Sequence, residues 1–176
     1  MSESPFSPWV TAYVGIGSNL GDSVAIVRSA IEALRCLDGI ENFRVSDLYE
    51  SAPLGPSDQP DFINAAVGFR TRDSAHDLLA RLQAIENRHG RARGGERWGA
   101  RSLDLDLLAF GDVVVSSAAL TVPHPGIAER NFVLLPLMDL DPALNIAGQG
   151  SVTELFERLA PKAHGWIRRI VQEGTS

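Results

Sequence analysis

The chain has 176 residues, of which 44% are hydrophobic and 22% charged, and its formal net charge is −6. This composition is ordinary for a soluble globular protein and excludes low-complexity and collagen-like classes. The length predicts a single domain over residues 1–176, with residues 1–8 as a disordered or extended tail.

The apolar patterns predict two strand–helix units in the first two thirds of the chain. The predicted strands are Val10–Gly17, Phe43–Ser51, Phe62–Arg70 and Ser102–Phe110. One helix is predicted from the N-cap Asp22 to about Leu37, with a stop near Gly39, and a second from the N-cap Ser74 to Gly90. The order βαββαβ is that of a ferredoxin-like unit, so we expect an α+β fold with helices on one face of an antiparallel sheet.

The last third of the chain predicts additions to this core. A Gly-Asp pair after the fourth strand predicts a hairpin turn into Val113–Val115. The apolar run Phe132–Met138 predicts a further strand, although it contains a proline. Thr153–Leu159 and His164–Gln172 predict closing helices. The ferredoxin-like core is therefore expected to carry an extra hairpin and C-terminal helices.

Targeting and redox signals are few. The N-terminus lacks the pattern of a secretory signal, and no apolar run approaches the length of a membrane span. The single cysteine, Cys36, cannot form an internal disulfide, and its place in a predicted helix favours a buried structural thiol. These features predict a cytoplasmic protein without membrane contact.

An Asp-x-Asp pair lies in the fourth predicted strand. Residues i and i+2 of a strand point to the same side, so Asp104 and Asp106 would share one face while the alternating leucines enter the core. Their Cα atoms would lie roughly 6.5–7 Å apart, which suits two Mg²⁺ ions about 3.5–4 Å apart. A solvated strand face or a charged edge strand gives the same pattern. Leu108 and Phe110 would continue the aspartate face, which favours the metal site because an entirely solvated face would stay polar.

A basic segment precedes this strand. Residues 88–101 hold five arginines and one glutamate, a net charge of +4, and since the whole chain carries −6, the remainder carries −10. An acidic protein with one short basic segment suits the binding of a small polyanion at one place and is poorly suited to wrapping nucleic acid. The sequence therefore predicts a metal–triphosphate site at the junction of this segment and the Asp-x-Asp strand.

The run RWGARSLDLDLL, from Arg97 to Leu108, resembles the signature of the 6-hydroxymethyl-7,8-dihydropterin pyrophosphokinases. The similarity extends, in the same order along the chain, to YVGIGSNLGD, SAPLGPSDQPDFINAAV, QAIENRHGRAR and LTVPHPGIAERNFVLLPL. It implies transfer of the β,γ-diphosphate of ATP to the pterin hydroxymethyl group with release of AMP, in folate biosynthesis. The resemblance also implies ATP as co-substrate, two Mg²⁺ ions and an α+β fold.

The resemblance also implies a role for individual residues. The catalytic residues are Arg91, Arg101, Asp104 and Asp106, of which the two aspartates are the metal ligands. The nucleotide is assigned to Gln83, Glu86, Arg93, Arg97, Trp98, Thr121, His124 and Arg130. The pterin is assigned to Ser51, Ala52, Leu54, Phe62, Asn64 and Phe132, with the two phenylalanines on its faces and the polar groups along its edge.

Other interpretations of the same residues stay open at this point. Without the resemblance, Gln83 and Glu86 fit a solvated helix face, and His124 fits a structural loop histidine. A nucleotidyltransferase also uses an Asp-x-Asp strand, but its Gly-Ser pair stands much closer to the aspartates. A ferredoxin-like RNA-binding module is disfavoured by the acidic body. The expected partners are the pterin and ATP, with transient contact to other folate-pathway enzymes and none to nucleic acid.

Overall fold

A six-stranded sheet forms the centre of the computed structural model, which describes residues 7–56, 58–89, 102–163 and 165–171. The strand order is β10-β3-β4-β1-β5, with β2 also paired to β4, and every pairing is antiparallel. The strands of this sheet are β1 (Val10–Ser18), β2 (Ile40–Val45), β3 (Tyr49–Ser51), β4 (Phe62–Thr71), β5 (Asp104–Phe110) and β10 (Ile167–Arg169).

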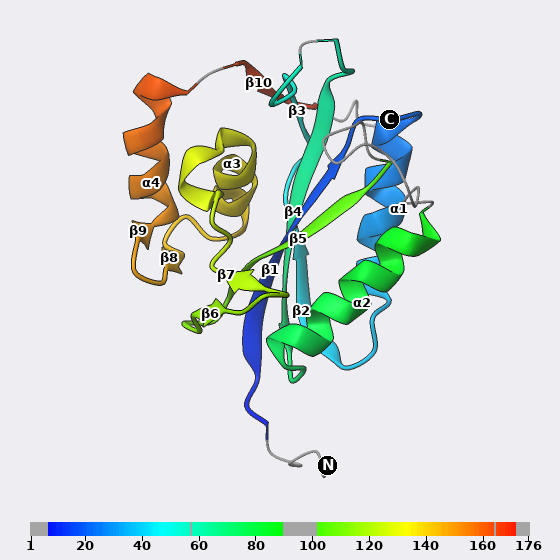
Figure 1. Cartoon of the computed structure of the whole chain (residues 1–176), viewed down its shortest axis with the longest axis vertical. Helices are drawn as coiled ribbons and strands as arrows, with labels where there is room; N and C mark the ends of the chain where they lie inside the picture. Colours follow the sequence, from blue (N-terminus) through cyan, green and yellow to red (C-terminus); the bar gives the residue numbers. More distant parts are fainter. Residues whose placement is uncertain (1–6, 57, 90–101, 164, 172–176) are drawn as a thin grey trace.

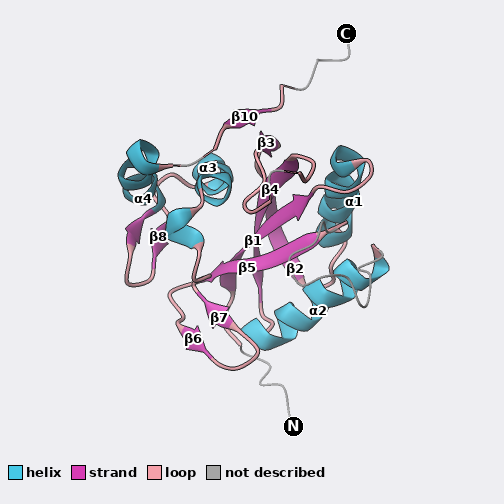
Figure 2. Ribbon diagram, turned by 45° about the horizontal axis from the view of Figure 1, so that its top comes forward, coloured by secondary structure: helices cyan, strands magenta, loops and turns pink. Residues whose placement is uncertain are grey.

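Helices cover both faces of this sheet (Figures 1 and 2). The helices α1 (Ser23–Arg35) and α2 (Ala75–Arg88) enclose one buried apolar cluster against the sheet. The helices α3 (Asn131–Leu140) and α4 (Val152–Leu159) enclose a second cluster on the opposite face. The remaining elements are the hairpins β6 (Val115–Ser116) with β7 (Thr121–Val122) and β8 (Asn145–Ile146) with β9 (Gly150–Ser151), and the 3₁₀ helices η1 (Ile127–Glu129) and η2 (Ala160–Lys162).

The predicted ferredoxin-like core is confirmed, and its helix starts follow from local hydrogen bonds. The Asp22 carboxylate accepts from the backbone N–H of Ala25 at 3.1 Å, and the Ser74 hydroxyl accepts from that of Asp77 at 3.1 Å. Both bonds satisfy donors that the first helical turn leaves without an intrahelical partner. The core therefore forms where the capping and periodicity signals predicted it.

A β-bulge in β5 changes which residues share a face. Val14 of β1 lies opposite Leu107, but the next residue back, Tyr13, lies opposite Ala109, so Leu108 is the extra residue. Leu108 and Ala109 consequently pack toward α3, and Phe110 packs with the cluster under α1 and α2. The prediction that Phe110 continues the aspartate face is therefore wrong, whereas Leu108 does so.

Three predictions in the last third of the chain are wrong. Phe132–Met138 lies in helix α3 because its apolar residues are buried on a helical face against the sheet, and Pro136 is accommodated inside that helix. The described part of the predicted helix His164–Gln172 contains the strand β10, which pairs with the edge strand β3. Val113–Val115 does not pair with β5; the hairpin forms instead between β6 and β7. Local pattern cannot anticipate these outcomes, since tertiary pairing decides them.

Two smaller expectations also change. The predicted strand Phe43–Ser51 is divided into β2 and β3, and at the break the Ser46 N–H donates to the Ala66 carbonyl while the Ser46 hydroxyl accepts from the Ala66 N–H. Cys36 is exposed rather than buried, because α1 ends at Arg35 and the cysteine lies at its C-cap, beyond the buried stripe of the helix.

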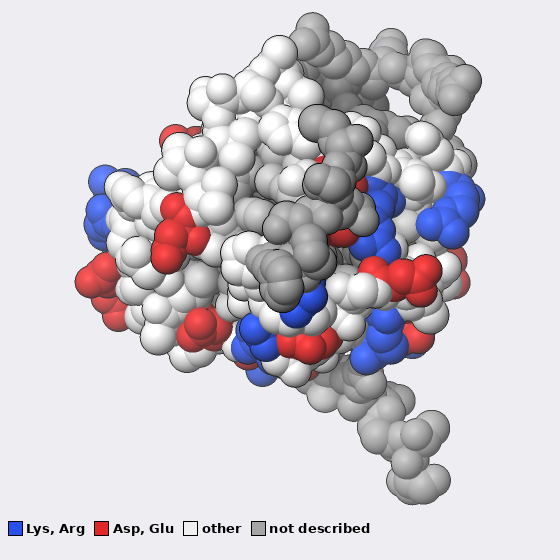
Figure 3. Space-filling model, turned by 90° about the horizontal axis from the view of Figure 1, so that it is seen from below, with Lys and Arg blue, Asp and Glu red and all other residues white. Residues whose placement is uncertain are grey.

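The described surface shows charges of both signs. Seen from below, Lys and Arg alternate with Asp and Glu among uncharged atoms (Figure 3). Among the described helices, none combines the length and apolar character needed to cross a membrane.

Candidate functional site

A cavity of about 290 Å³ lies between helix α3 and the face of the sheet that α3 covers. Its walls come from β1, β4, β5, the segment after β3, the loop after β7 and the start of α3. The lining residues are Gly15, Ile16, Gly17, Ala52, Leu54, Gln59, Phe62, Asn64, Ala65, Ala66, Asp104, Asp106, Leu108, His124, Arg130, Phe132 and Val133. Residues far apart in sequence therefore meet at one concave site, which is the usual setting for small-molecule binding.

The two predicted metal ligands line this cavity from the edge strand β5. Asp104 lies opposite Gly17 of β1, and Asp106 lies opposite Gly15. Residues directly opposite in an antiparallel pair share a face, so both carboxylates stand beside a stretch of β1 that has no side chain on that face. The flanking Leu105 is buried on the other face, as the alternation predicted.

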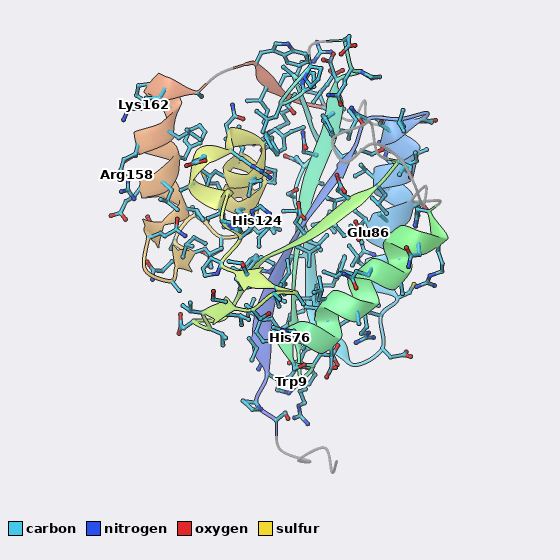
Figure 4. All side chains as sticks on the ribbon, viewed as in Figure 1. Trp9, His76, Glu86, His124, Arg158 and Lys162 are labelled. Atoms are coloured by element: carbon cyan, nitrogen blue, oxygen red, sulfur yellow. The ribbon has the colours of Figure 1, made fainter. Side chains whose placement is uncertain are left out.

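Glu86 of α2 fixes the peptide between the two aspartates. Its Oε2 accepts from the backbone N–H of Leu105 at 3.1 Å, and the glutamate is only 4% exposed. Because β5 is the last strand on this side of the sheet formed by the described residues, none of those residues provides a strand to pair with that N–H on its outer edge. In Figure 4, Glu86 and His124 stand on opposite sides of β5. Glu86 thus binds β5 on the side away from the cavity. It is not among the lining residues, so its predicted contact with the nucleotide stays a prediction.

Aromatic and amide groups form the other end of the cavity. Phe62 of β4 and Phe132 of α3 line it, both half-buried, and Asn64 follows Phe62 on the same strand face. The buried Asn64 donates from Nδ2 to the hydroxyl of Ser51 at 2.8 Å. Its Oδ1 is directed toward the space above Gly17, where a Cβ atom would lie 3.7 Å away. An amide acceptor and two aromatic side chains that line one cavity suit a flat heterocycle that carries N–H groups along one edge.

The loop that follows β3 supplies the rim of this end. Ala52 and Leu54 line the cavity, and Leu54 is 55% exposed. Asn19, which is buried at the end of β1, donates from Nδ2 to the side chain of Gln59 and to the Pro60 carbonyl, at 3.3 Å each. The loop is thereby joined to the strand that forms the cavity floor.

His124 and Arg130 approach the aspartates from the segment after β7. The backbone N–H of His124 donates to the Leu108 carbonyl at 2.9 Å, which fixes this loop beside β5. His124 Nδ1 accepts from the Gly126 N–H at 3.0 Å, so a neutral ring carries its proton on Nε2. Burial lowers the pKa of His124 below its ordinary value of 6.5; the nearby Arg130 also lowers it, and Asp106 opposes both. The guanidinium carbon of Arg130 lies 5.9 Å from the centre of the Phe132 ring.

Some predicted residues lie elsewhere or outside the described residues. Gln83 of α2 and Thr121 of β7 are exposed and do not line the cavity. The predicted arginine-segment residues Arg91, Arg93, Arg97, Trp98 and Arg101 lie outside the described residues. Sequence reasoning assigned no role to Gly15, Gly17, Gln59 or Val133, which line the cavity. The two glycines had a usable signal, since they alternate with the buried Val14 and Ile16.

The donor set of the site fits Mg²⁺ only together with a phosphate ligand. Among the described residues, no group of three or more His, Cys, Asp or Glu side chains is placed to hold a metal ion. Mg²⁺ commonly takes one or two carboxylates and completes its octahedral shell with water and substrate phosphate oxygens. Asp104 and Asp106 meet that requirement, since both carboxylates point to one side of β5 and reach the cavity.

A cavity with paired carboxylates at one end and an aromatic slot with an amide at the other is typical of an enzyme that binds a flat heterocycle beside a metal-bound phosphate. The family model for 7,8-dihydro-6-hydroxymethylpterin-pyrophosphokinase (HPPK) matches residues 13–142. The chain belongs to this family of enzymes.

Named relatives agree with the family match. The chain is 40% identical over 151 residues to the 2-amino-4-hydroxy-6-hydroxymethyldihydropteridine pyrophosphokinase of Haemophilus influenzae, covering 86% of this chain and 94% of that protein. It is 46% identical over 127 residues to the mitochondrial folate synthesis bifunctional protein of Pisum sativum, covering 72% of this chain and 24% of that one. A crystal structure of Plasmodium falciparum HPPK-DHPS shares the fold, with a TM-score of 0.68 at 14% identity. That match covers 90% of this chain and 45% of the Plasmodium chain.

We predict that Gly17→Ala closes part of the cavity without unfolding the protein. The added methyl would lie 3.7 Å from Asn64 Oδ1 and 3.9 Å from the Phe62 ring, both ordinary contacts, and Gly17 does not adopt a positive φ. Binding of 6-hydroxymethylpterin as a probe, measured by titration calorimetry, should weaken by about 10- to 100-fold, the usual effect of one misplaced carbon in a pocket. Unchanged affinity, at an unchanged thermal midpoint, would mean that the space above Gly17 is not used.

We also predict that His124 stays neutral at pH 7 in the Mg²⁺-free protein, with its proton on Nε2. Nitrogen-15 NMR of the ring, assigned with His124→Gln, should show a protonation midpoint below pH 6.5 because burial disfavours the charged form. The unfolded chain then binds this proton more readily than the folded one. The contribution to the free energy of unfolding is therefore complete above pH 6.5 and is lost as the pH falls through the folded-state pKa. A midpoint at or above 6.5 would contradict the burial argument.

Proposed function

We propose that this protein transfers the β,γ-diphosphate of ATP to the hydroxymethyl group of 6-hydroxymethyl-7,8-dihydropterin in folate biosynthesis, with release of AMP. The observation that carries the proposal is that one cavity joins the aromatic and amide end to the carboxylate end. Family membership supports the same reaction. The pterin is then placed with its hydroxymethyl group facing the phosphates of ATP.

The pterin end of the cavity binds and orients the acceptor. Phe62 and Phe132 provide apolar surfaces for the ring, and Asn64 Oδ1 accepts from its N–H groups. Because the Asn64 amide is held by Ser51, it is oriented before the ligand arrives. Such preorganisation lowers the entropy cost of bringing the two substrates together.

The phosphate end holds the diphosphate for in-line transfer. The pterin hydroxymethyl group loses its proton to solvent and its oxygen forms a bond to the β-phosphorus. The bond from that phosphorus to the α–β bridging oxygen breaks, and AMP leaves with that oxygen. Two Mg²⁺ ions, held by Asp104 and Asp106, would neutralise the triphosphate charge and lower the pKa of the attacking hydroxyl. The neutral His124 ring would donate from Nε2 to a phosphate oxygen, and Arg130 would supply a positive charge beside the phosphates.

The arginines of the basic segment complete this proposal. Arg91 and Arg101 are assigned to the charge that develops on the transferred phosphates, and Arg93, Arg97 and Trp98 to the nucleotide. Gln83, Glu86 and Thr121 keep their assignment to the nucleotide side. These roles rest on the resemblance of the sequence to the family's motifs.

We further propose that the enzyme acts in the cytoplasm and makes transient contact with other enzymes of folate synthesis. The relatives support the second part, since a pea protein that matches this chain is named a folate synthesis bifunctional protein. The solved Plasmodium chain named HPPK-DHPS likewise combines two such units in one chain.

The reaction products test the proposed function. Phosphorus NMR of the protein with ATP, Mg²⁺ and 6-hydroxymethyl-7,8-dihydropterin should show AMP and a pterin diphosphate in equal amounts. This follows because attack at the β-phosphorus expels AMP. The appearance of ADP and a pterin monophosphate would show single phosphoryl transfer and overturn the mechanism.

Charge-removing variants test the metal ligands. Asp104→Asn and Asp106→Asn keep the shape of each side chain but remove a hard anionic oxygen, so turnover should fall by orders of magnitude while the circular dichroism spectrum is retained. Asp112→Asn is the matched control, since Asp112 is an exposed carboxylate just beyond β5. If the first two variants turn over as fast as the control, the metal assignment is wrong.

A further inference from the structure

The C-terminal strand β10 lies beside the part of β3 that leads into the pterin end of the cavity (Figure 1). Ile167 lies opposite Ser51 and Arg169 lies opposite Tyr49. The Ala52 N–H donates to the Trp166 carbonyl at 3.1 Å just beyond the paired residues. The backbone pairing thus extends to Ala52, which lines the cavity. Residues 167–169 lie outside the region that the family model matches.

The side chain of Arg169 joins three segments around this strand. Its guanidinium donates to the Tyr49 hydroxyl at 3.0 Å, and it pairs with Asp139 of α3 at 3.2 Å and with Asp47 at 2.9 Å. The Tyr49 hydroxyl in turn donates to Asp139 at 2.7 Å, and the backbone N–H of Asp47 donates to the same carboxylate at 3.2 Å. One guanidinium therefore holds β10, the start of β3 and the end of α3 in fixed relation.

The tyrosine in this network keeps its proton over the physiological range. Burial, followed by the hydrogen bond and the negative charge of Asp139, raises the pKa of Tyr49 to about 12. The phenol therefore remains a donor to Asp139 and an acceptor from Arg169 near neutral pH.

Two of these segments, β3 and α3, contribute to the pterin end of the cavity, beside Phe62 and Asn64 of β4. β3 carries Ser51, which orients Asn64, and continues into the rim at Ala52. Phe132 lies in the first turn of α3 and Asp139 in its last turn, so the position of this single helix against β3 sets the distance between the Phe132 side chain and the amide edge. Resting on the proposed function, we infer that Arg169 is a positioning residue that sets the width of the pterin slot.

The strand offers a matched control next to the residue in question. Arg168 faces away from this network, pairs with Glu50, and has a 70% exposed side chain. Arg169 is itself 54% exposed, and ion pairs between exposed groups contribute little to stability. Both arginine-to-alanine variants are therefore expected to fold, and they remove the same charge from the same strand.

Steady-state kinetics of Arg169→Ala and Arg168→Ala test the inference. Arg169→Ala should raise the KM for the pterin by about tenfold or more, because small displacements of binding groups have large effects, and leave the KM for ATP unchanged. Arg168→Ala should leave both constants unchanged, and the thermal midpoints of the two variants should agree. An equal pterin KM in the two variants, or an equal rise for both substrates in Arg169→Ala, would overturn the inference.

A second measurement separates this inference from the proposed function. Amide hydrogen exchange of a peptide covering Leu48–Leu54 should be faster in Arg169→Ala than in Arg168→Ala, whether or not any substrate is turned over. Equal exchange in the two variants would mean that Arg169 does not order this segment. Absence of pterin diphosphate formation by the unaltered protein would instead remove the proposed function and leave this comparison of exchange rates intact.

Discussion

The antiparallel register between β1 and β5 is the constraint on which the site depends. It places Asp104 opposite Gly17 and Asp106 opposite Gly15, so the carboxylates face a strip of backbone rather than side chains. A shift of one residue would turn both aspartates into the apolar cluster under α1 and α2, at a large desolvation cost. Leu105 is buried in that apolar cluster, and its N–H donates a hydrogen bond to Glu86. Both features oppose such a shift. Packing of the core thus decides toward which face of the sheet the two carboxylates point.

The same floor of glycines connects the two halves of the cavity. Gly17 lies between Asp104 on one neighbouring strand and Asn64 on the other, and all three belong to one row across the sheet. The row places the Asn64 amide and the Asp104 carboxylate on either side of an open backbone position. Since both groups stand on the two strands that pair with β1, relative motion between the two ends is limited by the backbone hydrogen bonds of β1. The geometry suits a reaction that needs two substrates in line.

The sequence predicted the elements whose patterns are local and missed those that tertiary contacts decide. The caps at Asp22 and Ser74 and the alternation around Asp104 depend on neighbouring residues, and the structure confirms them. The run Phe132–Met138 is apolar throughout, so no periodicity separated helix from strand. Within His164–Gln172, residues Ile167–Arg169 form a strand because β3 offers an edge for pairing. The bulge at Leu108 likewise depends on the partner strand.

For the site, residue types with distinct chemistry were easier to predict than residues that act by absence or at a distance. Paired carboxylates and aromatic residues can be recognised in the sequence. Gly17, by contrast, acts by leaving space, and Arg169 acts through contacts with Asp139 and with Tyr49, which lies more than a hundred residues earlier in the chain. The distinction has a physical consequence. Replacing one atom of a group that contacts a substrate changes that contact directly. Replacing a positioning group such as Arg169 changes the separation between β3 and α3 instead. Selection for tighter or looser pterin binding can therefore operate on the C-terminal strand, and the carboxylates and the glycine floor of the phosphate end need not change.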